Sequence, residues 1–421
     1  MCPMEGTPLS TIDGRDGDVY QARWRMLALL VLGYVSLTLN WFNIASAFTP
    51  ISEDLGVSFE QLAMLIALFV LGYGVAHVPG GIIAARLGMK RTLVLGMVLQ
   101  GAGAALSGVA VGFLDLALYR VIAGVGASIF IAVAVAAVSV WFRDHEINLA
   151  LGIACGAAFS TGVALGLYAC IYVTDLAGWR GMLAICGIVN IVLAAAVAVW
   201  FHTPRGVSGL HGGRISRAGL IRALVDKQLW IYGIAMLGVY GAYFTASQLF
   251  SEYAVAQRGF TPGQGGMLGA ILALAGIPGS LVGGKVADLV RNYRSVIVVP
   301  LLLMGALIAA IPVAPDALLW FISFAIGFLF VFSYPAWLGV PADLSKIDPE
   351  QVGTAVGVML TLAAVGGFIV PVVFGHIVPD HGFAAGWIAV AAISVLTALV
   401  GLLGRKRAAE PVDEDRKLTV G

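Results

Sequence analysis

The chain has 421 residues, of which 60% are hydrophobic and 11% are charged, and its formal net charge is +1. A soluble domain carries about a quarter charged residues, so this composition excludes an ordinary soluble protein. The balanced charge gives no indication of a nucleic-acid partner, and the apolar runs lack the alternation of a transmembrane β-barrel.

The chain begins with a polar arm over residues 1–23, which has no short apolar core and therefore does not predict a cleavable signal peptide. Apolar runs of about 20 residues follow, each long enough to cross a bilayer as a helix. Those of the first bundle, 24–201, are predicted over 24–49, 58–84, 92–112, 115–140, 147–172 and 179–201.

A second group of apolar runs follows a basic, glycine-containing segment at 202–228, which we interpret as a cytoplasmic linker. These runs form a predicted bundle over 229–404, and the tail is 405–421. The spans are predicted over 229–254, 262–288, 294–312, 316–338, 352–377 and 384–403. We therefore expect an all-α membrane protein with twelve transmembrane helices in two six-helix bundles.

The two bundles repeat each other. Leu55–Leu65 matches Arg258–Leu268, and both segments precede a long apolar run that ends on a Gly-Gly pair. The same offset of 203 residues relates Gly56 to Gly259, Ser58 to Thr261, Gln61 to Gln264 and Gly124 to Gly327. A tandem repeat of a membrane unit is typical of transporters.

The distribution of Lys and Arg predicts the orientation. Nearly all of them lie in the two termini and in the loops that follow even-numbered spans, so these parts are assigned to the cytoplasm. Arg180 and Arg258 are left outside, and Arg120 lies inside a span. We expect a multi-pass protein of a bacterial inner membrane, with both termini cytoplasmic.

The sequence gives no indication of an enzyme. It has no nucleophile–base pairing, no metal-ligand spacing and no phosphate-binding loop, so we expect no cofactor and no metal. The four cysteines form no C-x-x-C pair, and three of them lie in apolar helices as small buried side chains.

The loop after the second span contains Gly81, Arg86, Lys90 and Arg91, and its counterpart over Gly284–Arg294 contains Asp288. These segments resemble the cytoplasmic loop motif of the major facilitator superfamily, a glycine followed by an acid and basic residues. The resemblance implies that the charges latch the cytoplasmic side and control gating. Ala85 stands where the first copy should carry its acid, and the alternative is that its basic residues only fix topology.

Span four contains Arg120 followed by Gly124 and Gly126, which resembles the fourth-helix motif of the same superfamily. In that family the arginine is linked to coupling and to substrate. A charge inside a membrane helix is costly and usually faces a cavity. The alternative is a structural arginine that binds loop carbonyls near the outer end of its helix.

The resemblance covers nearly the whole chain and implies a substrate site at mid-bilayer between the bundles, lined by the first, fourth, seventh and tenth helices. Tyr and Trp offer an apolar body with a donor, and Asn offers both a donor and an acceptor. For single aromatics the alternative is packing, and for the asparagines it is interhelical bonding. The substrate-binding candidates are Asn40, Asn43, Arg120, Tyr240, Tyr243, Gln248, Tyr334 and Trp337.

Titratable groups for coupling are few. His77 lies in span two and Glu252 near the outer end of span seven, and histidine titrates near neutral pH. The alternative for His77 is a packed or interfacial residue. No span contains the carboxylate pair that a proton relay would need.

These features predict a secondary transporter that works by alternating access. We expect uptake of a small, monocarboxylate-like organic anion by proton symport, in a monomer surrounded by lipid. The alternative is proton-driven efflux of hydrophobic drug-like compounds. Span five has Val163 after Gly162, where the family's exporters carry a Gly-Pro pair, and this favours uptake. A non-transporting sensor would need a signalling domain, which is not seen in the sequence.

Overall fold

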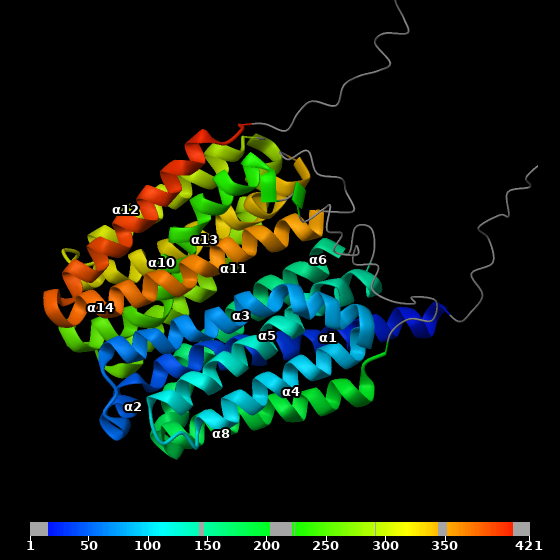
Figure 1. Cartoon of the computed structure of the whole chain (residues 1–421), viewed down its shortest axis with the longest axis horizontal. Helices are drawn as coiled ribbons and strands as arrows, with labels where there is room; N and C mark the ends of the chain where they lie inside the picture. The colour runs from blue at the N-terminus through cyan, green and yellow to red at the C-terminus, as the bar shows by residue number, and fades with distance from the viewer. Residues whose placement is uncertain are drawn as a thin grey trace, which may run out of the picture.

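A computed structural model describes residues 16–142, 147–202, 221–222, 224–290, 292–343 and 352–406. Within these ranges the chain is helical, with short turns between helices and no strand. Figure 1 shows two groups of long helices side by side, α1 to α8 in one and α10 to α14 in the other. We call these groups half one and half two. The all-α membrane fold predicted from composition is confirmed.

Half one runs from Asp16 to Trp200. Its elements are α1 (Asp16–Phe42), a 3-10 turn (Asn43–Ala47), α2 (Phe48–Leu55), α3 (Phe59–Leu87), α4 (Met89–Ser107), α5 (Phe113–Trp141), α6 (Ile147–Leu151), a π-helical turn (Gly152–Ala157), α7 (Ala158–Ala164), a second π-helical turn (Leu165–Ala169) and α8 (Cys170–Trp200).

Half two has the same general order of helices. Its elements are α10 (Lys227–Arg258), α11 (Pro262–Val290), a π-helical turn (Arg294–Val298), α12 (Val299–Ala310), α13 (Asp316–Asp343), α14 (Val352–Val400) and a final 3-10 turn (Gly401–Leu403).

Two of these helices, α8 and α14, each contain a chain reversal. Gly178 (φ 70°) and Gly382 (φ 79°) adopt a positive φ that glycine reaches without strain, and the helix turns back there. By length and hydropathy, eight helices of the described residues can cross a membrane, and the two longest contain these reversals. If each of these two helices is counted as two spans, and α4 and the shorter apolar helix Arg294–Ala310 are added, the set corresponds to the predicted spans. The number of membrane crossings stays a prediction.

The helix ends differ from the predicted spans where polar residues continue a helix beyond its apolar part. Helix α1 begins at Asp16, inside the predicted polar arm, and α13 continues to Asp343. Hydropathy marks the apolar part only, whereas backbone hydrogen bonding continues into water. Residues 1–15, 203–220 and 407–421 of the predicted arm, linker and tail lie outside the described residues.

The internal repeat is visible in the local structure. Ser58 and Gln61 form reciprocal hydrogen bonds of 3.2 and 3.0 Å that cap α3. Thr261 and Gln264 form the same pair of bonds at the start of α11, at 3.2 and 2.9 Å. Each of these reciprocal pairs is a capping box, which satisfies two backbone N–H groups that the first helical turn would leave unpaired.

Glycine also repeats where helices approach closely. A Cβ on Gly124 of α5 would overlap the carbonyl oxygen of Phe69 in α3. A Cβ on Gly327 of α13 would overlap the carbonyl of Leu272 in α11, at the same offset. Small residues at such positions allow the backbones of membrane helices to pack closely.

The two halves meet along α3 with α14 and along α7 with α11. At the end that carries Ser58, which we call the capped end, Phe59 lies 5.3 Å from Phe383, and Glu60 lies 3.3 Å from His376. At the opposite end of α3 and α11, a Cβ on Gly81 or Gly284 would meet no atom within 4 Å. The halves are therefore in contact at the capped end.

Candidate functional site

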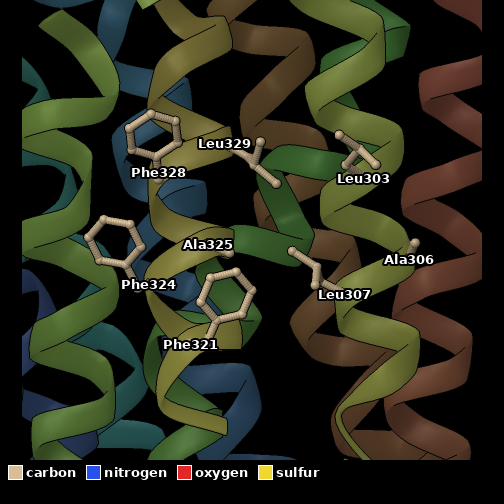
Figure 2. A pocket seen from close by; sticks show the side chains of 8 residues that line it. All are labelled: Leu303, Ala306, Leu307, Phe321, Phe324, Ala325, Phe328 and Leu329. Carbon is tan, nitrogen blue, oxygen red and sulfur yellow. The ribbon is translucent and has the colours of Figure 1, made fainter. Parts of the chain in front are cut away.

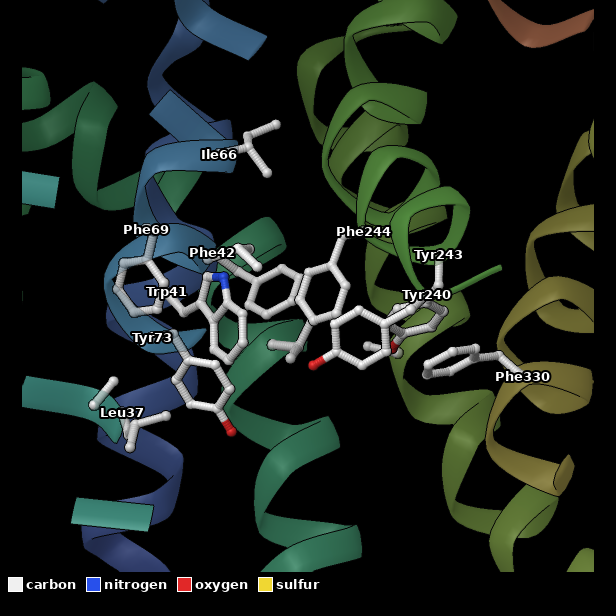
Figure 3. Packing of buried hydrophobic residues seen from close by; sticks show 14 of the residues in the cluster. Leu37, Trp41, Phe42, Ile66, Phe69, Tyr73, Tyr240, Tyr243, Phe244 and Phe330 are labelled. Atoms are coloured by element: carbon white, nitrogen blue, oxygen red, sulfur yellow. The ribbon is translucent and has the colours of Figure 1, made fainter. Parts of the chain in front are cut away.

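A layer of aromatic rings joins the two halves near the middle of the molecule (Figure 3). Trp41, at the end of α1, stacks on Phe69 of α3 at 4.8 Å and on Phe244 of α10 at 5.0 Å. Phe42 lies 5.7 Å from the same Phe244 ring. These side chains are at most 2% exposed, so the rings close the space between α1, α3 and α10.

The half-two side of this layer contains two predicted residues. Tyr243 stacks on Phe330 of α13 with ring centroids 4.0 Å apart, and Tyr240 lies 4.7 Å from Phe244. The repeat relates Trp41 to Phe244, so the two helices place aromatic rings at corresponding positions.

Tyrosine hydroxyls lie next to the ring layer. In Figure 3 the Tyr240 hydroxyl is directed toward half one, and the Tyr73 hydroxyl points away from the ring layer, below Trp41. Tyr240 and Tyr334 both pack near the Phe330 ring, with centroids 5.9 and 6.0 Å from it, and Tyr73 lies 4.8 Å from Trp41. We call Tyr73, Tyr240 and Tyr334 the tyrosine cluster. Phenol groups of this kind both donate and accept hydrogen bonds, which suits a polar solute.

His77 lies one helical turn beyond Tyr73 on α3, and the two rings are 4.4 Å apart. Its Nδ1 atom is 2.8 Å from the Tyr73 carbonyl oxygen and 2.7 Å from the Ser128 hydroxyl of α5. Its Nε2 atom is buried, with no hydrogen-bond partner among the described residues. One ring nitrogen is thus held in place while the other can gain or lose a proton.

Arg120 is buried in α5 and bonds to the end of α1. Its Nη1 donates to the Asn40 carbonyl at 3.0 Å and its Nη2 to the Trp41 carbonyl at 2.7 Å. The guanidinium also lies over the Phe69 ring, 4.6 Å from its centroid. The last carbonyls of a helix have no partner within it, so Arg120 satisfies two of them and holds Trp41 in position. These contacts match the structural alternative, and a role in transport stays a prediction.

Of the three predicted amide residues, Asn40 forms hydrogen bonds to backbone carbonyls. Asn40 donates to the Ser36 carbonyl at 2.8 Å and to the Cys186 carbonyl at 3.3 Å, which links α1 to α8. Asn43 and Gln248 are buried, and their amide atoms have no hydrogen-bond partner among the described residues. The Asn40 contact is the interhelical bonding given as the alternative.

The remaining candidates for the cavity and for coupling are Trp337, Tyr334 and Glu252, and they differ in their contacts. Trp337 donates from Nε1 to the Tyr232 carbonyl at 2.9 Å, so its polar edge links α13 to α10. Tyr334 lies 5.5 Å from Trp337 and is half-buried within the tyrosine cluster. Glu252 is half-buried, and no hydrogen bond or ion pair of its carboxylate is found within the described part of the chain.

The basic loop after α3 makes no latch in the described structure. Arg86 and Arg91 are exposed and Lys90 is half-buried, and none of them pairs with a described carboxylate. The side chain of Asp288 lies outside the described residues, although its backbone belongs to α11. Gating by these four residues therefore stays a prediction.

A hollow on the surface of half two is separate from this site. Figure 2 shows it between α12 and α13, with a volume of about 470 Å³. Its lining is apolar throughout, consisting of Leu303, Ala306, Leu307, Phe321, Phe324, Ala325, Phe328 and Leu329. A wall without polar groups suits lipid chains and does not suit a polar solute.

Comparison with known proteins identifies the family. Residues 30–371 match the Major Facilitator Superfamily. The chain belongs to this superfamily. It is a membrane transporter and not an enzyme, as the sequence motifs predicted.

Its relatives in the superfamily include transporters named for organic anions. The chain is 24% identical to the D-galactonate transporter of Escherichia coli O6:H1, covering 90% of this chain and 95% of the relative. It is also 24% identical to the probable sulfoacetate transporter SauU of Cupriavidus necator, and the match covers 86% of this chain and 89% of that relative. The hexuronate transporter of Bacillus subtilis is 24% identical, and the match covers 86% of this chain and 89% of that relative.

A solved structure supports the fold. A bacterial homolog of the human lysosomal transporter Spinster, in an inward-facing and occupied conformation, superimposes with a TM-score of 0.75. It is 17% identical, and the match covers 90% of this chain and 96% of that protein. At this identity the likeness shows the superfamily fold alone.

Sequence reasoning missed several residues of the central layer. Tyr73 and Phe69 lie on α3, whereas the predicted site drew its cavity residues from the first, fourth, seventh and tenth helices only. Phe244 and Phe330 were left out because they carry no polar atom. The spacing of Tyr73 and His77 was a usable signal, since residues four apart share one helical face.

Proposed function

We propose that this superfamily member takes up a small organic anion by proton symport, with a carboxylate bound at the tyrosine cluster. Galactonate, hexuronate and sulfoacetate, for which its relatives are named, all carry an acid group on a small polar body. A carboxylate is the feature that they share with the monocarboxylates predicted from the sequence. The comparisons support the anion class, and the geometry supports the place of binding.

The observation that carries this proposal is the His77 ring beside the tyrosine cluster. Its Nδ1 is fixed by the Tyr73 carbonyl and Ser128, while its buried Nε2 has no described partner. A proton on Nε2 makes the ring a cation that needs a counter-ion, and a bound carboxylate supplies it. Proton and anion thereby stabilise each other, which couples their movement.

We infer alternating access from the contact between the halves at the capped end. Along α3 the order is Glu60 at the capped end, Phe69 in the ring layer, then Tyr73 and His77, then Gly81 where no atom lies within 4 Å of an added Cβ. With the termini in the cytoplasm, the contacts at the capped end support an inward-facing state as part of this proposal. Rocking of half two against half one would break the Glu60–His376 contact and open the opposite side.

The positions of Lys and Arg support a bacterial inner-membrane location with both termini cytoplasmic, because basic loops remain on the cytoplasmic side. The central layer is built from one chain only, with Trp41 from half one stacked on Phe244 from half two. A monomer therefore contains every residue of the proposed site.

Transport by purified protein tests the anion class. In proteoliposomes with an inwardly directed proton gradient, we expect accumulation of galactonate, glucuronate, lactate or sulfoacetate, and collapse of the gradient should remove it. A panel of hydrophobic cations serves as the comparison for drug efflux. Proton-driven movement of these cations without any acid substrate would replace the proposal with the efflux alternative.

Substitution of His77 tests the coupling. His77→Gln keeps a polar side chain but cannot carry the proton, so we expect loss of gradient-driven accumulation while exchange of labelled for unlabelled anion continues. Ser280→Ala changes the position that the repeat relates to His77 and is the matched control. Full accumulation by His77→Gln would exclude His77 as the proton carrier, leaving the anion assignment intact.

A further inference from the structure

A groove on the outer surface of half one combines a cationic end with an apolar wall. It lies between the end of α3, the start of α4 and the end of α8, and its volume is about 670 Å³. Lys90 and Arg91 line it together with Leu87, Val94, Leu95, Val98 and Ala198. The groove is separate from the tyrosine cluster.

The apolar wall runs along one face of α4. Arg91, Val94, Leu95 and Val98 are spaced by three and four residues, so they lie above one another on the helix surface. Leu95 and Val98 are 38% and 39% exposed. The wall therefore leads from the cationic end of the helix toward its apolar middle, as the acyl chain of a phospholipid does below its headgroup.

The two cations have no anionic partner among the described residues. Arg91 is exposed and Lys90 is half-buried, and no described carboxylate pairs with either. The acid that the loop motif would place at residue 85 is replaced by Ala85. Both cations lie in the first turn of α4, whose dipole adds positive potential there.

We propose that this groove selects an anionic phospholipid, with the phosphate between Lys90 and Arg91 and an acyl chain along Val94, Leu95 and Val98. Lipid covers an apolar membrane surface in any case, so the claim concerns the choice of headgroup. A basic side chain at the membrane surface favours an anionic lipid by about fivefold, because it attracts the negative headgroup.

Half two offers an internal comparison. The repeat relates Lys90 to Tyr293 and Arg91 to Arg294. Arg294 donates from Nε to the Gly404 carbonyl at 2.6 Å, so one of its donors is engaged within half two. The hollow on α12 and α13 has no charged residue in its lining. Among the described residues, cations without a described acidic partner line a groove in half one, whereas the hollow of half two has none.

Native mass spectrometry of the full-length protein can test the proposal, with dioleoyl phosphatidylglycerol and dioleoyl phosphatidylcholine as probes of identical chains. For the wild type we expect retention of phosphatidylglycerol at least roughly tenfold above phosphatidylcholine at low salt. The preference should weaken as salt rises, since the attraction is screened. Glycerol phosphate, which has the headgroup without the chains, should neither bind nor compete at equal concentration.

The test variant is Lys90→Gln/Arg91→Gln, and the matched control is Arg25→Gln/Lys285→Gln, which removes two exposed cations outside the groove. We expect the preference to fall roughly tenfold or more in the first and to remain in the second. Thermal unfolding of both variants shows whether they are folded, and Leu95→Glu blocks the wall as an independent variant. Equal lipid retention by the wild type, or equal losses in test and control, would overturn the proposal, and so would binding of glycerol phosphate alone.

Discussion

Ser58 caps α3 in the same way that Thr261 caps α11, and Gly124 meets a neighbouring carbonyl just as Gly327 does. Other positions at the same offset differ in chemistry. Arg120 donates to two carbonyls of α1, whereas Ser323 at the related position bonds to the Leu268 carbonyl at 2.5 Å. The two halves have thus kept their caps and close approaches while their polar interiors have diverged.

The difference places most of the polar chemistry in half one. Gln100 donates to the Leu37 carbonyl at 2.8 Å inside half one, whereas Leu303 at the related position lines the apolar hollow of half two. His77 is related to Ser280, which donates to the Ile277 carbonyl of its own helix at 2.9 Å. Half two contributes tyrosines and phenylalanines instead. A duplicated fold needs matching caps and glycines, but a transport site needs only one copy of each polar group.

The largest expected effect comes from the shared packing positions. Gly124→Val and Gly327→Val each place a side chain on a backbone carbonyl that cannot move aside, so both should lower the free energy of unfolding by more than about 3 kcal/mol. Thermal unfolding in detergent and the yield of monodisperse protein measure the loss. Similar losses at both positions would confirm that the halves share this requirement.

Gly284→Ala is the control for these substitutions. An added Cβ there meets no atom within 4 Å in this state, so the melting temperature should stay close to that of the wild type. A Gly124→Val protein as stable as this control would contradict the close approach of α3 and α5.

Arg120 should give the next largest effect. Arg120→Gln removes two hydrogen bonds from a charged donor, each worth about 1.5–3 kcal/mol, and leaves the Asn40 and Trp41 carbonyls unpaired. Ser323→Ala in half two removes one neutral bond, worth about 1 kcal/mol. Thermal unfolding should therefore separate the two variants, and uptake by Arg120→Gln should fall together with stability.

The opposite outcome would assign a different role to Arg120. If Arg120→Gln melts like the wild type but no longer binds the anion, its guanidinium contacts substrate directly. Ligand-induced shifts of the melting temperature, measured on the same samples, distinguish this outcome from a structural loss.

The sequence predicted the fold further than the site, for physical reasons. Apolar length and a repeated Ser-x-x-Gln or Thr-x-x-Gln box are local signals, so the helices and their caps could be predicted. The partner of Arg120 depends on where α1 ends in space, and the stacking of Trp41 on Phe244 depends on how the halves approach. Such contacts between distant segments leave no periodic pattern.

The smallest expected effect concerns the contact that joins the halves at the capped end. The Glu60–His376 distance is 3.3 Å, and the side chains are 45% and 72% exposed, so water screens the pair and its contribution is at most about 1 kcal/mol. Asp316→Asn is a matched control because Arg258–Asp316 has the same 3.3 Å length but lies within half two. Glu60→Gln should shift the population toward opening of the capped end by up to about fivefold, without changing the melting temperature.

Distances between spin labels at the exposed Glu53 and Asp380 would report the shift. An equal distribution in Glu60→Gln and Asp316→Asn would mean that the aromatic contacts of Phe59 hold the capped end closed without the Glu60–His376 contact.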